Sequence, residues 1–122
     1  MRNISFTLTT RQFLDGSKTV TRRRGWAMLR PGTLLQAVEK SQGLRKGEKV
    51  RKLGVILVLD VRQEMLRDLC GSSYGDMEAS REGFPEMLGE EFADMFCRHM
   101  NCGREAVVTR IEFERVEEGH AP

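Results

Sequence analysis

The sequence has no long hydrophobic run. Its longest apolar stretch, Val55–Leu59, is five residues long and ends at Asp60, whereas a helix that spans a bilayer needs roughly 18 to 20 apolar residues. The first residues, 1–6, also lack the apolar core of a secretory signal peptide. We therefore expect no membrane partner and a cytoplasmic location.

Cysteine and histidine are scarce, with three cysteines and two histidines in the chain. An odd number of cysteines without an export signal fits the reducing cytoplasm. Cys97, His99 and Cys102 resemble a set of metal ligands, but their spacing is poor for one face of a helix. Buried thiols and a surface imidazole are the simpler interpretation, so we expect no metal and no cofactor.

Internal repeats, low-complexity tracts and linkers rich in Pro, Gly or Ser are also absent. A chain of 122 residues is short for two domains, and its 39% apolar content is enough to build one core. We therefore expect a single domain over residues 1–122, and we take it to be a monomer.

Charge is distributed unevenly along the chain. Residues 11–52 contain 12 Lys and Arg against three Asp and Glu, a net charge of +9, and residues 76–118 have a net charge of −7. A basic half of this kind attracts phosphate or another anion. The alternative is that most of these charges belong to solvated faces.

Alternation of apolar and polar residues predicts short strands over 4–8, 17–23, 33–38, 50–61 and 105–116. Helical spacing predicts helices over 11–15, 64–69, 74–82 and 85–100, with Gly16 and Gly83 as stops. The 50–61 strand has a nearly continuous apolar centre, which predicts burial on both faces. Strands at both ends with most helix placed late indicate an α+β fold, a small curled sheet or barrel with helices packed outside.

A glycine, hydroxyls and cations gather in one short segment: Gly16, Ser17, Lys18, Thr19, Thr21, Arg22, Arg23 and Arg24. Cations, hydroxyl donors and backbone N–H groups around a glycine predict an anion site. The segment is not a P-loop, because the GxxxxGK[ST] pattern is absent. A plain basic strand remains the alternative interpretation.

Two further features extend this basic region. Trp26 follows the cluster, where it would either stack on a base or fill the barrel. Arg45 and Lys46 lie in a basic loop, 41–52. Contacts to phosphates need this much charge and a free nucleoside does not, which favours a polynucleotide ligand.

The spacing Gly16-x-Lys18-x-x-Thr21-x-Arg23 resembles the GxKxxTxR signature of the ASCH domains, which have a PUA-like fold. Other segments resemble the family in the same order along nearly the whole chain: 4–6, 30–35, 81–84 and 108–113. Thr33 stands where the family usually has Asp. The resemblance implies a small PUA-like β-barrel with a cleft between the barrel and the helices.

The resemblance also implies a function. The family is associated with RNA binding and RNA metabolism, and small bacterial members resemble amidohydrolases that deacetylate N4-acetylcytidine. Carried over residue by residue, their catalytic set would be Lys18, Thr21 and Glu82. Other members have been proposed as ribonucleases, and small chains of this type also resemble phage proteins.

Amide hydrolysis needs a nucleophile, a base and a group that stabilises the oxyanion. Thr21 would supply the hydroxyl, a neutral Lys18 would take its proton, and Glu82 would pass it to the leaving amine. Each residue also has a simpler interpretation, as a strand threonine, a solvated lysine, and a surface carboxylate or a structural partner of Arg23. The sequence therefore predicts either a module that binds RNA, DNA or a modified base, or a hydrolase, and a pure interaction protein is a third option.

Overall fold

A computed structural model of the chain describes residues 1–40 and 43–117. The elements follow in the order β1 (Arg2–Ser5), the 3-10 helix η1 (Thr7–Thr9), α1 (Thr10–Leu14), β2 (Val20–Arg23), β3 (Leu34–Val38), β4 (Lys52–Met65), the 3-10 helix η2 (Leu66–Leu69), α2 (Ser73–Arg81), α3 (Gly89–Met100) and β5 (Val107–Val116). This succession confirms the predicted α+β class.

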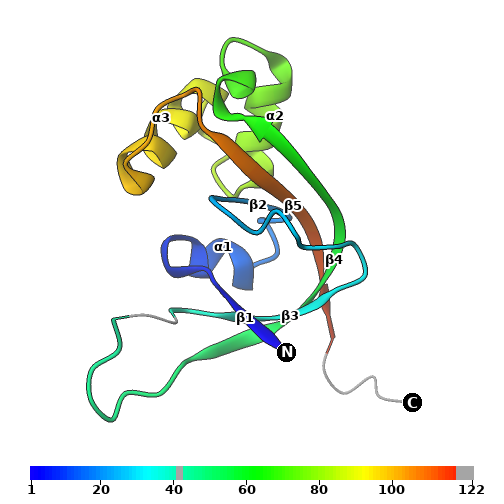
Figure 1. Cartoon of the computed structure of the whole chain (residues 1–122), viewed down its shortest axis with the longest axis vertical. Coiled ribbons are helices and arrows are strands. Elements are labelled where there is room, and N and C mark those ends of the chain that lie inside the picture. Colours follow the sequence, from blue (N-terminus) through cyan, green and yellow to red (C-terminus); the bar gives the residue numbers. More distant parts are fainter. Residues whose placement is uncertain (41–42, 118–122) are drawn as a thin grey trace.

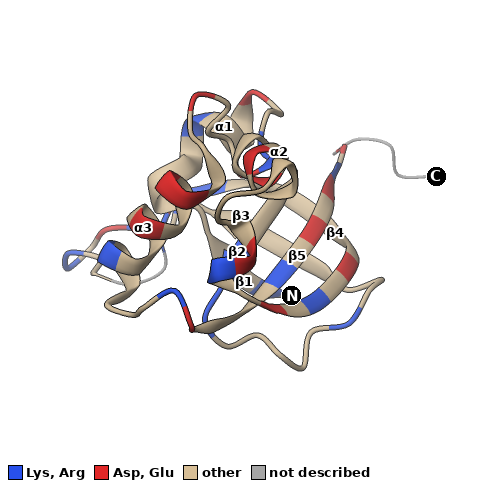
Figure 2. Ribbon diagram, turned by 90° about the horizontal axis from the view of Figure 1, so that it is seen from above, with Lys and Arg blue, Asp and Glu red and all other residues tan. Residues whose placement is uncertain are grey.

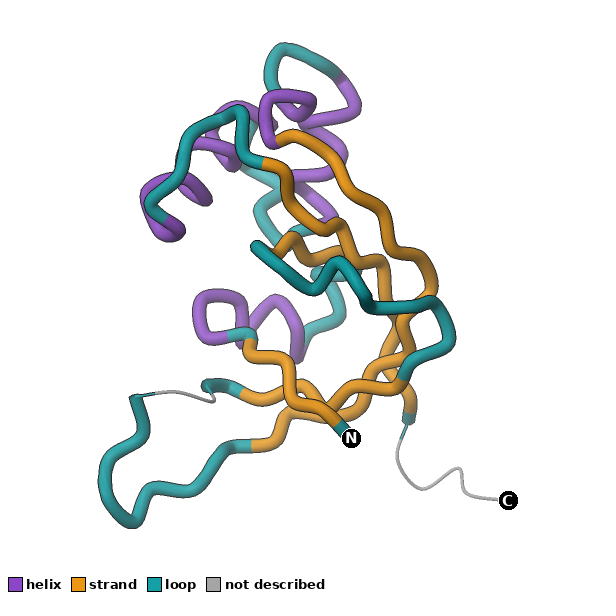
Figure 3. Tube along the Cα trace, in the orientation of Figure 1, coloured by secondary structure: helices purple, strands orange, loops and turns teal. Residues whose placement is uncertain are grey.

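The five strands form one sheet in the order β1-β3-β4-β5-β2. β1 pairs with β3 in parallel and every other pair is antiparallel. The sheet curls into a half-barrel, with α1 on its open side and α2 and α3 gathered at one end (Figure 1). This is the curled sheet with helices packed outside that the order of predicted elements indicates. The tube in Figure 3 shows that β4 and β5 run side by side along the whole curl.

Three strand predictions are wrong at their ends. β2 begins at Val20, three residues after the expected start at residue 17. β1 stops at Ser5, and Leu8, expected on the buried face, lies in η1 with 62% of its surface exposed. β4 runs on to Met65, so the predicted 64–69 helix is only the 3-10 turn η2. The sheet is antiparallel around β4, and such a sheet leaves one face toward solvent. Leu59 is accordingly exposed, so burial of β4 on both faces is also wrong.

The helices follow the prediction more closely. α2 differs by one residue at each end from the expected range, and Gly83 follows it with a φ of +103°. α3 begins at Gly89 rather than Pro85, because the Glu91 side chain accepts a hydrogen bond from the Leu88 backbone N–H and caps the helix there. Thr9 makes no side-chain cap bond at α1. Residues 41–42 of the basic loop and residues 118–122 lie outside the described residues.

Two hydrophobic clusters hold the fold. The larger lies inside the curl, where Phe6 stacks on Phe13 with ring centroids 4.9 Å apart and Phe113 packs against both. The smaller joins α2, α3 and η2 around Leu69 and Phe92. A cavity lies between the two clusters, since Phe6 from the larger and Phe92 from the smaller both line it. None of the described helices is both long and apolar enough to cross a bilayer.

Candidate functional site

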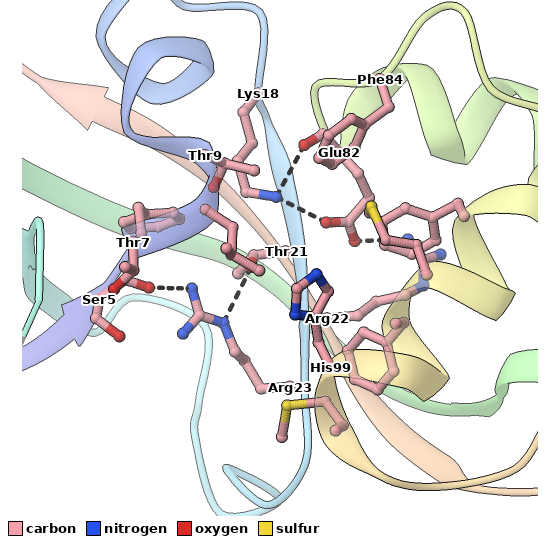
Figure 4. Close-up of a pocket in the computed structure, with 16 residues that line it drawn as sticks. Ser5, Thr7, Thr9, Lys18, Thr21, Arg22, Arg23, Glu82, Phe84 and His99 are labelled. Carbon is pink, nitrogen blue, oxygen red and sulfur yellow. Dashed lines mark hydrogen bonds and ion pairs between the residues drawn. The ribbon is translucent and has the colours of Figure 1, made fainter. Parts of the chain in front are cut away.

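A cavity of about 220 Å³ lies between η1 and β2 on one side and α3 on the other. Its polar wall is formed by Lys18, Thr21 and Arg23 around β2, with Glu82 from the end of α2 (Figure 4). The opposite wall is apolar and comes largely from α3. The structure thus brings together the three predicted catalytic residues, which are up to 64 positions apart in the sequence.

Lys18 and Glu82 form a buried ion pair. Lys18 Nζ lies 2.7 Å from Glu82 Oε1 and donates a second hydrogen bond, of 2.9 Å, to the Glu82 backbone carbonyl. Only 3% of either side chain is exposed. A backbone hydrogen bond between the neighbouring residues holds the pair in place. The Thr19 N–H donates to the Arg81 carbonyl, which ties the start of β2 to the end of α2.

Arg22 also lines the cavity, and it holds the second oxygen of Glu82. Its Nη1 donates to Glu82 Oε2 at 2.9 Å, and its Nη2 donates to Glu64 and Glu78 at 2.8 and 2.6 Å. Arg110 on β5 binds Glu78 from the far side. Two arginines and three carboxylates therefore form a buried network behind the cavity wall, and each charge in it has a partner.

This network joins the basic and acidic halves of the sequence. Lys18 and Arg22 come from the basic half, and Glu78 and Glu82 come from the acidic half. On the ribbon, β4 and β5 both carry bands of Lys and Arg as well as bands of Asp and Glu (Figure 2). The uneven charge of the sequence is thus partly cancelled inside the fold.

Arg23 is the cation of the cavity whose hydrogen bonds, within the described residues, all go to uncharged groups. Its Nε donates to Thr21 Oγ1 at 3.0 Å and its Nη2 donates to the Ser5 carbonyl at 2.6 Å. It forms no ion pair with any residue in the described part of the chain. The hydrogen bond from Arg23 leaves the Thr21 hydroxyl free to donate its own proton, and stabilises negative charge that develops on that oxygen.

Burial shifts the pKa values of the cavity cations in a consistent direction. Burial lowers the pKa of Lys18 below its ordinary value; Glu82 opposes this shift, and Arg23 and Arg22 add to it. Burial likewise lowers the pKa of Arg23 to about 10, against the opposing effect of Glu82. Arg23 thus keeps its positive charge at neutral pH. Burial alone would lower the pKa of Arg22, but Glu82, Glu64 and Glu78 outweigh it and raise that pKa.

The apolar wall is made of α3 side chains and the residues around it: Leu8, Phe84, Phe92, Met95, Phe96 and Met100, with His99 beside them. Phe92 is fully packed, whereas Met95 and Phe96 are half-buried and face the cavity. Aromatic rings and thioethers on one side and a cation with hydrogen-bonding groups on the other suit a flat, partly polar ligand.

The other predicted binding residues do not line this cavity. Gly16, Ser17 and Thr19 lie in the exposed approach to β2, where Gly16 has a φ of +82°. Arg24, Arg45 and Lys46 are exposed on loops. Trp26 is half-buried and packs against the larger core cluster, with the Arg2 guanidinium 3.8 Å above its ring.

Sequence reasoning missed several residues of the site. One of them is Glu78, which lies four residues after Tyr74 and four before the predicted Glu82, so that this spacing indicates one helix face with two carboxylates. Arg110 was missed as well, because it alternates with apolar residues and lies on the face of β5 that also carries Glu112 and Glu114, as a solvent-facing cation would. Ser5 contributes only its backbone carbonyl, so its side-chain type carries no signal.

Solved structures resemble the chain over nearly its full length. A protein from Enterococcus faecalis V583 assigned to the family model DUF984 is 15% identical, with 99% of this chain and 84% of that one covered and a TM-score of 0.60. An ASCH domain from Lactobacillus crispatus JV V101 is 13% identical, with 93% and 78% covered and a TM-score of 0.57. No family model and no curated protein matches the sequence.

The fold is therefore that of the PUA-like α+β proteins, as the strand order and the half-barrel indicate. Within that class it is an ASCH-type fold, which the similarity to the Lactobacillus crispatus domain shows. This confirms the fold that the resemblance to the ASCH domains implies.

Proposed function

We propose that the chain binds a single modified nucleobase or nucleoside in the cavity between β2 and α3. The observation that carries this proposal is the pairing of two unlike walls around about 220 Å³. Phe96 and Met95 offer an apolar surface for a flat ring, and Arg23 offers a cation without a carboxylate partner in the described chain. A cavity of this size suits one base better than a duplex or a folded strand.

Isothermal titration calorimetry with cytidine and N4-acetylcytidine tests this proposal. Thr21→Val removes the hydroxyl that faces the cavity while keeping the shape, and we expect it to weaken binding by about tenfold. Thr19→Val makes the same chemical change at an exposed position two residues away and should leave binding unchanged. Absence of binding by the wild-type protein, or equal losses in both variants, would refute the cavity as the binding site.

A second candidate function is hydrolysis of an acylated cytidine. It is favoured by one observation, the buried Lys18–Glu82 pair in the wall that also carries Thr21. In this mechanism the Thr21 oxygen attacks the acyl carbon, and its proton passes to a neutral Lys18 amine. The C–N bond then breaks, and the cytosine amine takes a proton through Lys18 and Glu82. Water cleaves the remaining Thr21 ester to give the free carboxylic acid and restore the hydroxyl.

Chromatography of the reaction with N4-acetylcytidine tests the second candidate. Wild type and Thr19→Val should release cytidine and acetate, Thr21→Ser should keep part of the rate, and Thr21→Val and Lys18→Met should lose it. Turnover that survives in Thr21→Val would exclude Thr21 as the nucleophile. An RNA oligonucleotide incubated with a metal chelator in the same assay tests the ribonuclease alternative, which predicts chain cleavage.

A further inference from the structure

A second depression lies beside the cavity, between the start of β1 and the loop 24–33 that joins β2 to β3. Its volume is about 620 Å³. We call it the 24–33 groove. Its walls carry Arg2 and Arg30, the half-buried Trp26, and the apolar side chains of Met28 and Leu34, which are 84% and 49% exposed. No acidic residue lines it.

Trp26 fixes the position of one cation in this groove. Its φ is +62°, a conformation that a bulky residue adopts only when its surroundings hold it. The Leu29 N–H donates to the Trp26 carbonyl, and the ring packs against the core cluster. The Arg2 guanidinium lies 3.8 Å over the ring. Stacking of this kind orders the planar guanidinium and leaves its N–H groups for an incoming anion.

Three cations lie in or next to the groove: Arg2 and Arg30 line it, and Arg24 begins the loop that forms one of its walls. All three are exposed, and none forms an ion pair with a residue of the described chain. In the other basic loop, by contrast, Lys40 and Arg51 pair with nearby glutamates at 3.3 and 3.1 Å. The 24–33 groove therefore combines uncompensated positive charge with exposed apolar surface, the two features that bind a single-stranded nucleic acid.

The groove and the cavity are connected by two segments of the chain. β1 carries Arg2 at the groove and Ser5 at the cavity, about 10 Å apart at ~3.3 Å per residue. The chain after β2 makes the same passage, because Arg23 lines the cavity and Trp26 the groove. The hydrogen bond from Arg23 to the Ser5 carbonyl joins the two segments at the cavity end. Adjacent nucleotides of one strand can thus reach both sites.

We propose that the 24–33 groove binds the nucleotides next to a base held in the cavity, on a single-stranded RNA or DNA. The phosphates pair with Arg2, Arg24 and Arg30, and unstacked bases lie against Met28 and Leu34. A duplex would offer phosphates to the arginines but no base faces to the apolar side chains. The inference rests on the proposed function for the identity of the nucleotide in the cavity. Binding in the groove does not depend on it, because the groove is defined by its own residues.

Fluorescence anisotropy with end-labelled oligocytidylate RNA and DNA of about 12 nucleotides, at several salt concentrations, tests the groove. Arg24→Ala/Arg30→Ala removes two free cations, and Arg45→Ala/Lys46→Ala removes two from the other basic loop as a matched control. We expect the groove variant to bind about tenfold more weakly or worse. Its plot of log K against log salt should be shallower by about 1.4, since each phosphate contact on a single strand contributes about 0.7. The control should match the wild type.

A third variant separates base contacts from general electrostatic attraction. Met28→Ser should lower the affinity a few-fold without changing the salt slope, because it removes apolar contact and no charge. Comparison of RNA with DNA then shows whether a 2′-hydroxyl is read. The proposal is overturned if neither oligonucleotide binds the wild type, or if the control loses as much affinity as the groove variant. It is also overturned if the wild type binds vesicles of phosphatidylcholine and phosphatidylserine but neither oligonucleotide.

These experiments can refute the proposal for the cavity and the proposal for the groove independently of each other. Titration of the Arg24→Ala/Arg30→Ala protein with N4-acetylcytidine should give wild-type affinity, since neither residue lines the cavity. If no nucleoside binds but the oligonucleotide still depends on Arg24 and Arg30, the proposed function is wrong and the groove stands. If nucleosides bind and the oligonucleotide does not, the groove is wrong and the cavity stands.

Discussion

Lys18 and Glu82 form a buried ion pair in which the two residues differ in their number of charged partners. Glu82 accepts from Lys18 at 2.7 Å through one oxygen and from Arg22 at 2.9 Å through the other. In the described chain, the Lys18 amine has no carboxylate partner but Glu82. Removal of either residue therefore leaves a different set of charges behind.

The first prediction is an asymmetry in stability between two variants. Glu82→Gln strands the Lys18 charge in a site that is almost fully buried, and we expect it to lower the free energy of unfolding by about 3–5 kcal/mol. Lys18→Met leaves Glu82 with Arg22 and should cost about 1–2 kcal/mol. Urea denaturation at pH 7, followed by the fluorescence of Trp26, measures both.

The double variant is the control for this comparison. Lys18→Met/Glu82→Gln has no stranded lysine charge, and Arg22 still has Glu64 and Glu78. It should be more stable than Glu82→Gln alone. Two outcomes would contradict this charge network: equal losses of unfolding free energy in the two single variants, or a loss in the double variant equal to their sum.

The polar wall could be predicted from the sequence only where local spacing places the residues. Thr21 and Arg23 are two apart on a strand, so they share a face, and the hydrogen bond between them follows from that placement. Glu82 could be placed in the site only by a resemblance to known domains, because no local pattern brings α2 beside β2. The long-range contact depends on how the sheet curls, which the alternation of apolar and polar residues does not encode.

The acid-sensitivity of the fold is the second prediction. Burial alone would raise the pKa of Glu78, but hydrogen bonds from Arg110 and Arg22 outweigh it and lower that pKa. A carboxylate with a depressed folded-state pKa stabilises the fold fully above its unfolded value, near 4.5, and this contribution is lost as the pH falls through the folded value. The urea midpoint should therefore fall steeply below about pH 4.5.

Glu78→Gln provides the comparison for that pH dependence. It leaves Arg22 and Arg110 short of one carboxylate, so the protein should be less stable at pH 7. Its stability should then change less than that of the wild type between pH 4.5 and lower values. A variant with the same steep acid transition as the wild type would show that Glu78 does not control it.

Close packing of α2 and α3 gives the third prediction. A Cβ placed on Gly89 would lie 2.0 Å from the Leu69 carbonyl oxygen, and one on Gly75 would lie 1.7 Å from it. Backbone atoms cannot move aside as side chains do, so Gly89→Ala should cost at least about 3 kcal/mol. Gly16→Ala meets no atom within 4 Å and carries only the cost of a positive φ, about 1–2 kcal/mol. Thermal unfolding of the two variants compares these effects, and a similar loss in both would contradict the close contact.

The sequence gives little indication that α2 and α3 pack closely at Gly75 and Gly89. Gly75 and Gly89 are separated by a turn that contains Pro85, and glycine near Pro suggests a loop rather than a packing surface. The expected helix start at Pro85 was wrong for a related reason. The Gly89 N–H donates to Asp76 Oδ1 on α2, so a neighbouring helix helps to fix the beginning of α3, together with the local Glu91 cap.

The last prediction concerns the protonation state of Lys18 during the proposed hydrolysis. Only a neutral amine can accept the Thr21 proton, and burial lowers the pKa of Lys18 from 10.5, with Glu82 opposing and the two neighbouring arginines assisting. The neutral fraction grows as the pH rises through that depressed pKa. We therefore expect kcat/KM for N4-acetylcytidine to increase with pH and to level off with a midpoint below 10.5. A rate that falls with rising pH, or a Lys18→Met protein that keeps the same rising limb, would assign the titration to another group. Lys18→Arg is the sharper control, because it keeps a cation beside Glu82 but cannot lose its proton in this range, and it should be inactive at every pH tested.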